Sequence, residues 1–252
     1  MRTLRVKKSQ LPQVLFESAS SIVLCKPAGL PVIPGRSPED AWSLRDWAEQ
    51  RYRGTKVYVV HRIDKLVSGV VLFALTPEAH RSYSMAFEQG KIDKRYLALV
   101  DGADCQDEGE IAIPLMESNR SPYVVPRSGT KNTKIHRTTY KVIDRFRNFA
   151  LLEVTLWTGF RHQIRVHLKA IGHPLAVDPL YGNRSVLRLS DIKGRNRYRM
   201  KGPSESPIIE RVSLHALSIQ FEEYPAGNLQ RIEAPVPRDF SHLLKALRKY
   251  DT

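Results

Sequence analysis

Short apolar runs alternate with polar turns along most of the chain, and this pattern predicts a series of strands. The runs are rich in β-branched and aromatic residues, and Gly, Pro, Ser or Asp residues bound them. Strands are therefore expected at residues 14–16, 22–24, 57–60, 70–75, 95–100, 138–143, 149–157 and 212–221.

Helical spacing and capping residues predict helices between these strands. Ser37 and Thr76 each stand before a Pro and an acidic residue, as N-cap residues do. Helices are expected to begin at these two residues and to end near Gly54 and Gly90, with others at 162–171 and 243–247. There is no internal repeat and no regular βαβα rhythm, which predicts an α+β fold with a mixed or antiparallel sheet. A basic arm, 1–13, is expected before one catalytic domain, 14–252.

Composition adds a class of partner to this picture. The 252 residues are 42% hydrophobic, enough for a sizeable core, and 40 Lys and Arg against 26 Asp and Glu give a net charge of +14. Such a surface favours polyanions, and nucleic acid is the expected partner. No apolar run is long enough for a membrane span and no signal peptide is recognisable, so a cytoplasmic protein without a membrane partner is expected.

One carboxylate stands among bases in the stretch VVHRIDKLVSGVVLF at residues 59–73. Asp64 follows His61 and Arg62 in a predicted loop between two strands. It could form a structural ion pair, or it could be a nucleophile or general base kept ionised by neighbouring cations. The local pattern is compatible with both interpretations.

A second segment, TGFRHQIRVH at residues 158–167, places a Gly-containing turn before a helix rich in Arg and His. Amide groups at the helix start, with Arg161 and Arg165, could hold a phosphate, or Arg165 could reach a carboxylate of another loop. Solvated surface charge is the alternative. Tyr96, after Arg95 on a predicted strand, could be a core aromatic or could stack on a nucleobase.

Other chemistries lack support in the sequence. His162, His167 and His173 do not have metal-ligand spacing, and Cys25 and Cys105 form no CxxC pair. There is no GxxxxGK[ST] or GxGxxG motif for a nucleotide, and Ser68 is outside a GxSxG elbow. No cofactor and no metal are expected.

Several motifs together resemble the RluA family of RNA pseudouridine synthases, and they occur in the family's order. The likeness extends from about residue 14 to residue 244. The motifs are KPAGLPV at 26–32, HRIDKLVSGVVLFALTPEAH at 61–80, KRYLALV at 94–100, TGFRHQIRVHL at 158–168, GHPLAVDPLYG at 172–182, RVSLHAL at 211–217 and APVPRDF at 234–240.

The resemblance implies a pseudouridine synthase catalytic fold, with a long, largely antiparallel mixed sheet, flanking helices and loops, and a central RNA-binding cleft. It implies an isomerase that modifies a uridine of rRNA or tRNA, with RNA as partner, no nucleotide cofactor and a monomeric state. Asp64 falls on the catalytic Asp, Tyr96 on the Tyr that stacks on the base, and Arg165 on the basic partner of that Asp. The substrate-binding residues it implies are His61, Arg62, Arg161, His162, Gln163 and Ile164.

The chain departs from the family's pattern beside the predicted site. Lys65-Leu66-Val67 replaces an Arg, Asp, Thr type of triplet, Phe160 separates Thr158-Gly159 from Arg161, and Val177 replaces a Gly. A catalytically silent RNA-binding relative is therefore the alternative function, whereas a nuclease would need clustered acids or paired His residues. No S4 RNA-binding domain is expected before the core, so the basic loops 117–137 and 183–211 are expected to contact RNA.

Overall fold

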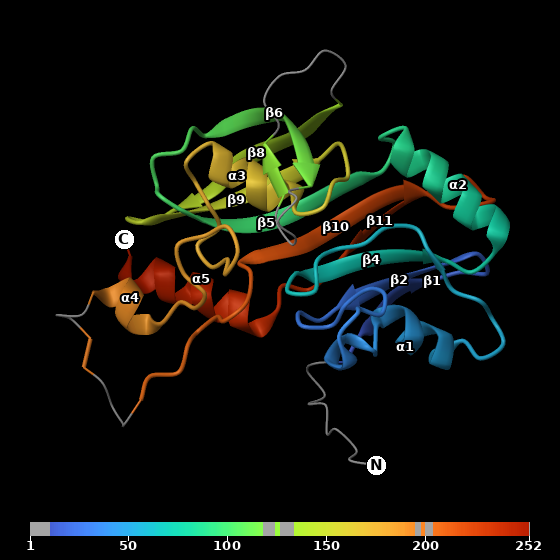
Figure 1. The fold of residues 1–252 in the computed structure, drawn as a ribbon, viewed down its shortest axis with the longest axis horizontal. Coiled ribbons are helices and arrows are strands. Elements are labelled where there is room, and N and C mark those ends of the chain that lie inside the picture. Colours follow the sequence, from blue (N-terminus) through green and yellow to red (C-terminus); the bar gives the residue numbers. More distant parts are fainter. Residues whose placement is uncertain (1–10, 118–123, 127–133, 195–197, 200–203, 252) are drawn as a thin grey trace. The chain divides into compact units, whose positions relative to one another are not determined.

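A computed structural model of the chain describes residues 11–117, 124–126, 134–194, 198–199 and 204–251 (Figure 1). The chain forms two compact units. Unit 1 comprises Met1–Asp93 and Ala216–Pro235, and unit 2 comprises Lys94–His215 and Val236–Thr252. Most of the predicted arm, 1–13, is outside the described residues.

The strands of unit 1 surround one buried strand, β4 (Ser68–Ala74), in which every residue is buried. β2 (Ser21–Lys26) pairs with it in antiparallel register from Ser21↔Ala74 to Lys26↔Gly69. β1 (Gln13–Glu17) pairs with β2, and β3 (Tyr58–Val59) also pairs with β4. Because β4 begins at Ser68, the loop with Asp64 leads directly into it.

Gly69 allows a close approach between two backbones. Its φ is +121°, and an added Cβ would lie 2.0 Å from the carbonyl oxygen of Ala216 in β10 (Leu214–Glu222). Only glycine fits both the conformation and the space. β10 continues into an antiparallel hairpin with β11 (Leu229–Glu233), which the sequence pattern did not predict.

The first helix begins later than the sequence predicted. Residues Pro38–Asp40 form a 3₁₀ turn, and α1 (Leu44–Arg51) starts only after Ser43. Ser43 and Asp46 form a capping box, with the Ser43 amide donating to Asp46 Oδ2 at 2.9 Å. This reciprocal cap satisfies two amides, which the side chain of Ser37 does not do, so it sets the start of the helix. α2 (Pro77–Glu88) begins as predicted, because Thr76 Oγ1 accepts from the Ala79 amide.

The strands of unit 2 follow the order β5 (Asp93–Asp101), β9 (Phe149–Leu156), β8 (Ile135–Arg145), β6 (Glu108–Glu117) and β7 (Val124–Pro126). Each described pair among them is antiparallel. The sequence pattern missed β6 and β7. Gly109 and Pro114 interrupt the run of β6 and weaken its signal, yet both residues are in register with β8.

Among its described residues, unit 2 has three helices. α3 (Gln163–Ala170) packs on β6, β7 and β8, as Figure 1 shows. α5 (Arg238–Tyr250) is longer than the predicted 243–247 because the buried stripe Phe240, Leu243, Leu244 and Leu247 extends toward its start. The short α4 (Leu189–Lys193), which was not predicted, contacts α5. The α+β class is confirmed, and no described helix combines the length and apolar content of a membrane span.

Candidate active site

In unit 1, Asp64 lies in a tight turn before β4. The Val67 amide donates to the Asp64 carbonyl at 3.0 Å, and the side chains of Ile63 and Val67 are buried on either side of it. The Asp64 side chain itself is partly exposed. Buried apolar neighbours therefore fix the backbone of the turn while the carboxylate stays within reach of water.

Lys26 holds the same turn in place through hydrogen bonds to backbone carbonyls. Its side chain is fully buried, and Nζ donates to the carbonyls of Pro27 at 3.0 Å, Leu30 at 2.7 Å and Lys65 at 3.1 Å. The Gly29 amide also donates to the Lys65 carbonyl, at 2.8 Å. Three carbonyl dipoles thus solvate a buried ammonium group and join the segment after β2 to the turn after Asp64. This role of Lys26 was not predicted from the sequence. The signal that could have indicated it is the position of a Lys directly after an apolar strand.

Three bases surround Asp64 in sequence, and their environments differ. His61 Nε2 accepts a hydrogen bond from the Leu72 amide at 2.9 Å, and its ring stacks on Phe87 with centroids 4.8 Å apart. An accepting Nε2 implies a neutral ring with its proton on Nδ1. The side chain of Arg62 is exposed. Lys65, one of the departures from the family's pattern, forms an ion pair with Asp40.

In unit 2, the entry to α3 is a sharp turn centred on His162. Its φ of 58° is left-handed, and it is the one non-glycine residue with positive φ among those described. His162 Nδ1 lies 2.8 Å from the Tyr181 hydroxyl, which also accepts from the Val124 amide at 2.8 Å. Tyr181 therefore links the turn to β7. This strained conformation is held by its surroundings.

Gln163 holds the turn before α3 against β8. The side chain is 2% exposed; Oε1 accepts from Thr158 Oγ1 at 3.0 Å and from the Phe160 amide at 3.1 Å, and Nε2 donates to the Arg137 carbonyl and Thr138 Oγ1, both at 3.0 Å. Ile164 is buried as well. Gln163 and Ile164 therefore lie buried at this turn, and their predicted role in substrate binding stays a prediction.

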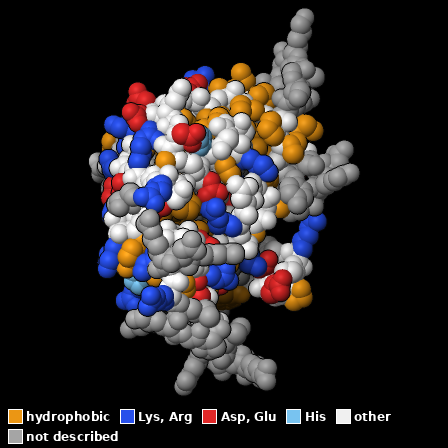
Figure 2. Space-filling view, turned by 90° about the vertical axis from the view of Figure 1, so that its left-hand side faces the viewer, with side chains coloured by type: hydrophobic (Ala, Val, Ile, Leu, Met, Phe, Trp, Pro, Cys, Tyr) orange, Lys and Arg blue, Asp and Glu red, His pale blue; other side chains and the backbone are white. Residues whose placement is uncertain are grey.

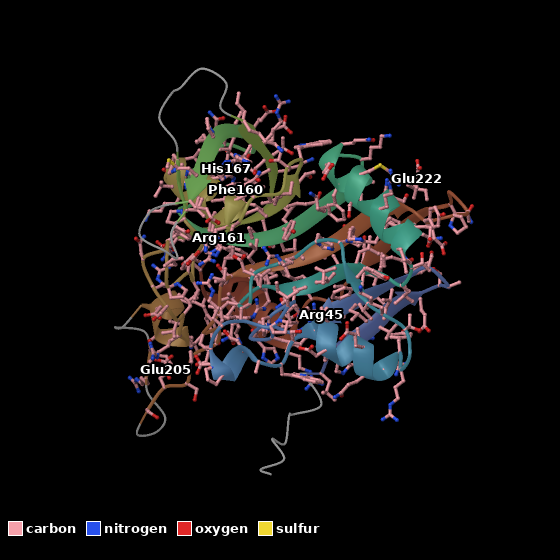
Figure 3. The ribbon with its side chains drawn as sticks, turned by 45° about the vertical axis from the view of Figure 1, so that its right-hand side comes forward. Arg45, Phe160, Arg161, His167, Glu205 and Glu222 are labelled. Atoms are coloured by element: carbon pink, nitrogen blue, oxygen red, sulfur yellow. The ribbon has the colours of Figure 1, made fainter. Side chains whose placement is uncertain are left out.

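Two neutral histidines lie where α3 packs on its neighbouring strands, His167 on α3 itself and His136 on β8; Figure 3 shows His167 together with Phe160 and Arg161. His167 is fully buried, 3.0 Å from Thr138 Oγ1 and 3.2 Å from the Ile113 carbonyl, and burial lowers its pKa to about 4. Burial also lowers the pKa of His136, which accepts from the Leu115 amide at 3.1 Å and packs on Phe160. These rings contribute to the packing under the helix without charge.

Arg165 forms a buried bidentate ion pair with Asp178. Nε donates to Oδ2 at 2.7 Å and Nη2 donates to Oδ1 at 2.8 Å; the two side chains are 6% and 1% exposed. The Leu180 and Tyr181 amides also donate to Asp178, and the guanidinium lies 5.0 Å from the centroid of the Tyr181 ring. Burial alone would raise the pKa of Asp178, but the hydrogen bonds and charge of Arg165 outweigh it and the pKa falls. The guanidinium is thus fixed in one plane.

Tyr96 and Arg161 occupy different settings in unit 2. Tyr96 lies on β5 opposite Val154 of β9, and it is 8% exposed. Its neighbour Arg95 donates to Glu153 at 3.1 Å. The Arg161 side chain is 34% exposed and lies 3.2 Å from Glu117 at the end of β6. Tyr96 is therefore rigidly placed, whereas Arg161 keeps access to solvent.

The predicted residues divide between the two units. Unit 1 holds His61, Arg62 and Asp64, and unit 2 brings Arg161, His162 and Arg165 together at α3. The meeting of Asp64 with Arg165 and Tyr96 stays a prediction. Asp178 and Tyr181 were not predicted as partners of the α3 residues. The signal that could have indicated Asp178 is its position as a lone acid in the apolar run PLAVDPLYG. Parts of the predicted RNA loops, 118–123, 127–133, 195–197 and 200–203, lie outside the described residues.

Comparison with known proteins gives a consistent result. A family model described as RNA pseudouridylate synthase matches residues 20–170. The chain is 34% identical over 94% of its length to ribosomal large subunit pseudouridine synthase D of Nitrosomonas europaea, and 36% identical over 76% of its length to an uncharacterized RNA pseudouridine synthase of Bacillus subtilis. It spans 65% and 56% of those relatives. The structure of human RNA pseudouridylate synthase domain containing 4 has the same fold, with a TM-score of 0.72 at 23% identity, covering 93% of this chain and 92% of that one.

Proposed function

Because this chain belongs to the RNA pseudouridylate synthase family, as its motifs predicted, we propose that it isomerises a uridine of RNA to pseudouridine. The observation that carries the proposal is the extent of the family match. It covers residues 20–170 and so includes both the turn with Asp64 and the whole of α3. The relatives named as ribosomal large subunit synthases favour ribosomal RNA as the substrate, with transfer RNA as the second candidate.

The reaction needs little apparatus. The bond between N1 of the base and C1′ of the sugar breaks, the base rotates within the site, C5 bonds to C1′, the C5 proton leaves to solvent and N1 gains a proton. Asp64 assists departure of the base, either by attacking C1′ or by removing a sugar proton to give a glycal. No electrons or groups are exchanged with a carrier, so the proposed enzyme uses neither a nucleotide cofactor nor a metal.

Arg165 is proposed to keep Asp64 ionised and aimed. A guanidinium within contact distance lowers the pKa of a carboxylic acid by about 1 to 3 units. The bidentate bonds from Nε and Nη2 to Asp178 support this role, because they hold the guanidinium in one orientation. In this arrangement Asp178 is a positioning residue.

Tyr96 is proposed to stack on the everted uracil. Removing a base from its stack costs a few kcal/mol, and stacking on an aromatic ring returns about 1 to 3 kcal/mol. The buried position of Tyr96 on β5 supports this role, since a rigid ring can hold the base while it turns. His61, Arg62, Arg161 and His162 are proposed to contact the RNA, with Gln163 and Ile164 holding the turn that presents two of them.

The rest of the assignment follows the same reading. Residues 14–252 are proposed to act as one catalytic domain after a basic arm at 1–13, with RNA lying in a cleft across it. The protein is proposed to work in the cytoplasm as a monomer. The net charge of +14 supports contact with RNA beyond the reacting nucleotide.

The test measures tritium release from unmodified large-subunit ribosomal RNA labelled at uridine C5. The wild-type protein is expected to release tritium, and Asp64→Asn is expected to reduce release to background while RNA affinity stays within about threefold. Asp104→Asn is the matched control, since that side chain is 89% exposed, and it should retain full activity. RNA binding without release would favour the silent relative, and strand scission that survives Asp64→Asn would favour a nuclease.

A further inference from the structure

A groove of about 600 Å³ lies in unit 2 between α5 and the segment around α4, and its lining shares no residue with the candidate site. α5 contributes His242, Lys245, Ala246, Lys249 and Tyr250 to its lining. The opposite side is formed by Leu189 of α4, Tyr198 and residues 204–208. Figure 3 shows Glu205 close to α4. The groove is thus built entirely from described residues of a single unit.

Positive charge is concentrated along one side of α5. Arg238, Lys245 and Lys249 are exposed, and with the exposed ring of His242 they recur at intervals of three or four residues, so the three cations lie on one stripe of the helix. Figure 2 shows Lys and Arg side chains spread over one face of the molecule beside hydrophobic ones. Asp239, the acid of α5, pairs with Arg211, and Asp251, directly after the helix, accepts from Asn148.

Two ammonium groups converge on one aromatic ring at the groove. Lys193 Nζ lies 4.1 Å and Lys249 Nζ 5.2 Å from the centroid of the Tyr250 ring. The hydrogen bond to Lys249, assisted by the charge of Lys193, lowers the pKa of the Tyr250 hydroxyl. Cation–π contact holds both cations in place despite their mutual repulsion.

These lysines lack acidic neighbours within the part of the chain that the structure describes. No carboxylate there lies within ion-pair distance of Lys193, Lys245 or Lys249. Glu205, the one acid in the lining, accepts from the Ser190 amide at 2.9 Å. Residues 192–204 contain five Lys or Arg and no Asp or Glu. The three lysines thus outnumber the single carboxylate of the lining, and an excess of cations favours an anion.

We propose that this groove binds the phosphate backbone of the RNA substrate, with Lys193, Lys245 and Lys249 as the phosphate contacts. The inference rests on the proposed function, because that function makes RNA the polyanion at hand. Tyr250 is a positioning residue that holds two of the lysines. Contacts of this kind carry no base sequence, so the groove sets affinity and register and leaves the choice of base to the catalytic site.

The test compares two double variants with equal loss of charge. Lys245→Gln with Lys249→Gln removes two proposed contacts, and Lys91→Gln with Lys169→Gln removes two exposed lysines elsewhere. Each lost phosphate contact on single-stranded RNA reduces the slope of log affinity against log salt by about 0.7, which corresponds to about fivefold in affinity at about 0.1 M salt. The groove variant should therefore bind unmodified large-subunit ribosomal RNA roughly 25-fold more weakly, with a slope lower by about 1.4.

The single-turnover rate at saturating RNA should be unchanged in the groove variant. Tyr250→Phe, which keeps the ring, should bind RNA like the wild type, and Tyr250→Leu should weaken binding and lower the slope. Equal losses in both double variants, or wild-type affinity in the groove variant, would overturn the proposal. The proposal would also be overturned if the groove variant no longer bound phosphatidylserine vesicles but kept the RNA affinity of the wild type. Failure of the wild-type protein to release tritium contradicts the proposed activity instead, and the binding comparison still tests the groove.

Discussion

At the scale of single residues, the candidate site depends on side chains whose partners come from distant parts of the sequence. Arg165 is fixed by Asp178, and the turn after Asp64 is fixed by Lys26. The motifs identified Asp64, Tyr96 and Arg165 as candidates, but they did not indicate which residues hold these side chains in position. A bidentate ion pair or a buried ammonium depends on packing, which composition and spacing do not encode.

Asp178→Asn should separate the positioning of Arg165 from the folding of unit 2. The amide cannot accept two charge-assisted bonds, so we expect the single-turnover rate to fall by about 100-fold while RNA affinity changes little. Asp239→Asn is the matched control, because Arg211 binds Asp239 through Nε and Nη2 at 2.6 and 2.9 Å. If the two variants lose the same activity per folded molecule, as judged by circular dichroism, Asp178 has only a structural role.

Lys26→Met should destabilise the protein, although Met is similar in size to the Lys side chain that it replaces. The substitution leaves three carbonyls without their ammonium donor, and hydrogen bonds to charged groups contribute about 1.5 to 3 kcal/mol each. We expect the free energy of unfolding in urea to fall by roughly 2 to 4 kcal/mol. Lys91→Met, at an exposed position, should leave it within about 0.5 kcal/mol of wild type; a similar value for Lys26→Met would contradict the anchor.

At the scale of elements, strands were easier to predict than the exact ends of helices. Apolar runs such as Val70–Leu72 stand out because β4 is buried on both faces, whereas β6 was missed because Pro114 and Gly109 interrupt it. The predicted start of α1 was wrong because the sequence has two capping signals, and only the one at Ser43 forms a reciprocal cap. Local sequence contains both signals, and tertiary packing chooses between them.

His167 should make the packing of α3 sensitive to acid. Its pKa is about 4 in the folded protein and about 6.5 when unfolded, so between these values the unfolded state binds more protons. The free energy of unfolding therefore falls as the pH drops through that window, by up to about 3 kcal/mol. Urea unfolding from pH 7 to pH 4.5 measures this decline. His167→Gln should flatten it, and an equally steep decline in that variant would show that other groups are responsible.

At the scale of the whole molecule, charge and chemistry have separate roles. The chain has 40 basic and 26 acidic residues, and they are spread along its length, while the proposed reaction needs one carboxylate. The sequence predicted the family well because several motifs recur in order. It did not predict the groove beside α5, because Lys193, Lys249 and Tyr250 come together only in the folded unit.

RNA affinity should therefore depend steeply on salt even when catalysis is disabled. If six phosphates are contacted, log affinity falls with log salt with a slope of about −4 for single-stranded RNA. Asp64→Asn should have the same slope as the wild type, since it removes no cation. Filter binding over a range of potassium chloride concentrations measures it; a flat response would mean that base contacts, and not phosphates, dominate.

The way Lys26 is held has a consequence for how the protein responds to acid. Peptide oxygens do not titrate, so the bonds that fix the turn after Asp64 persist at a pH where carboxylates become protonated. Asp178 does titrate, and the orientation of Arg165 is lost once that acid gains a proton. In acid, the backbone of the turn with Asp64 should therefore keep its place beyond the pH at which the orientation of Arg165 is lost.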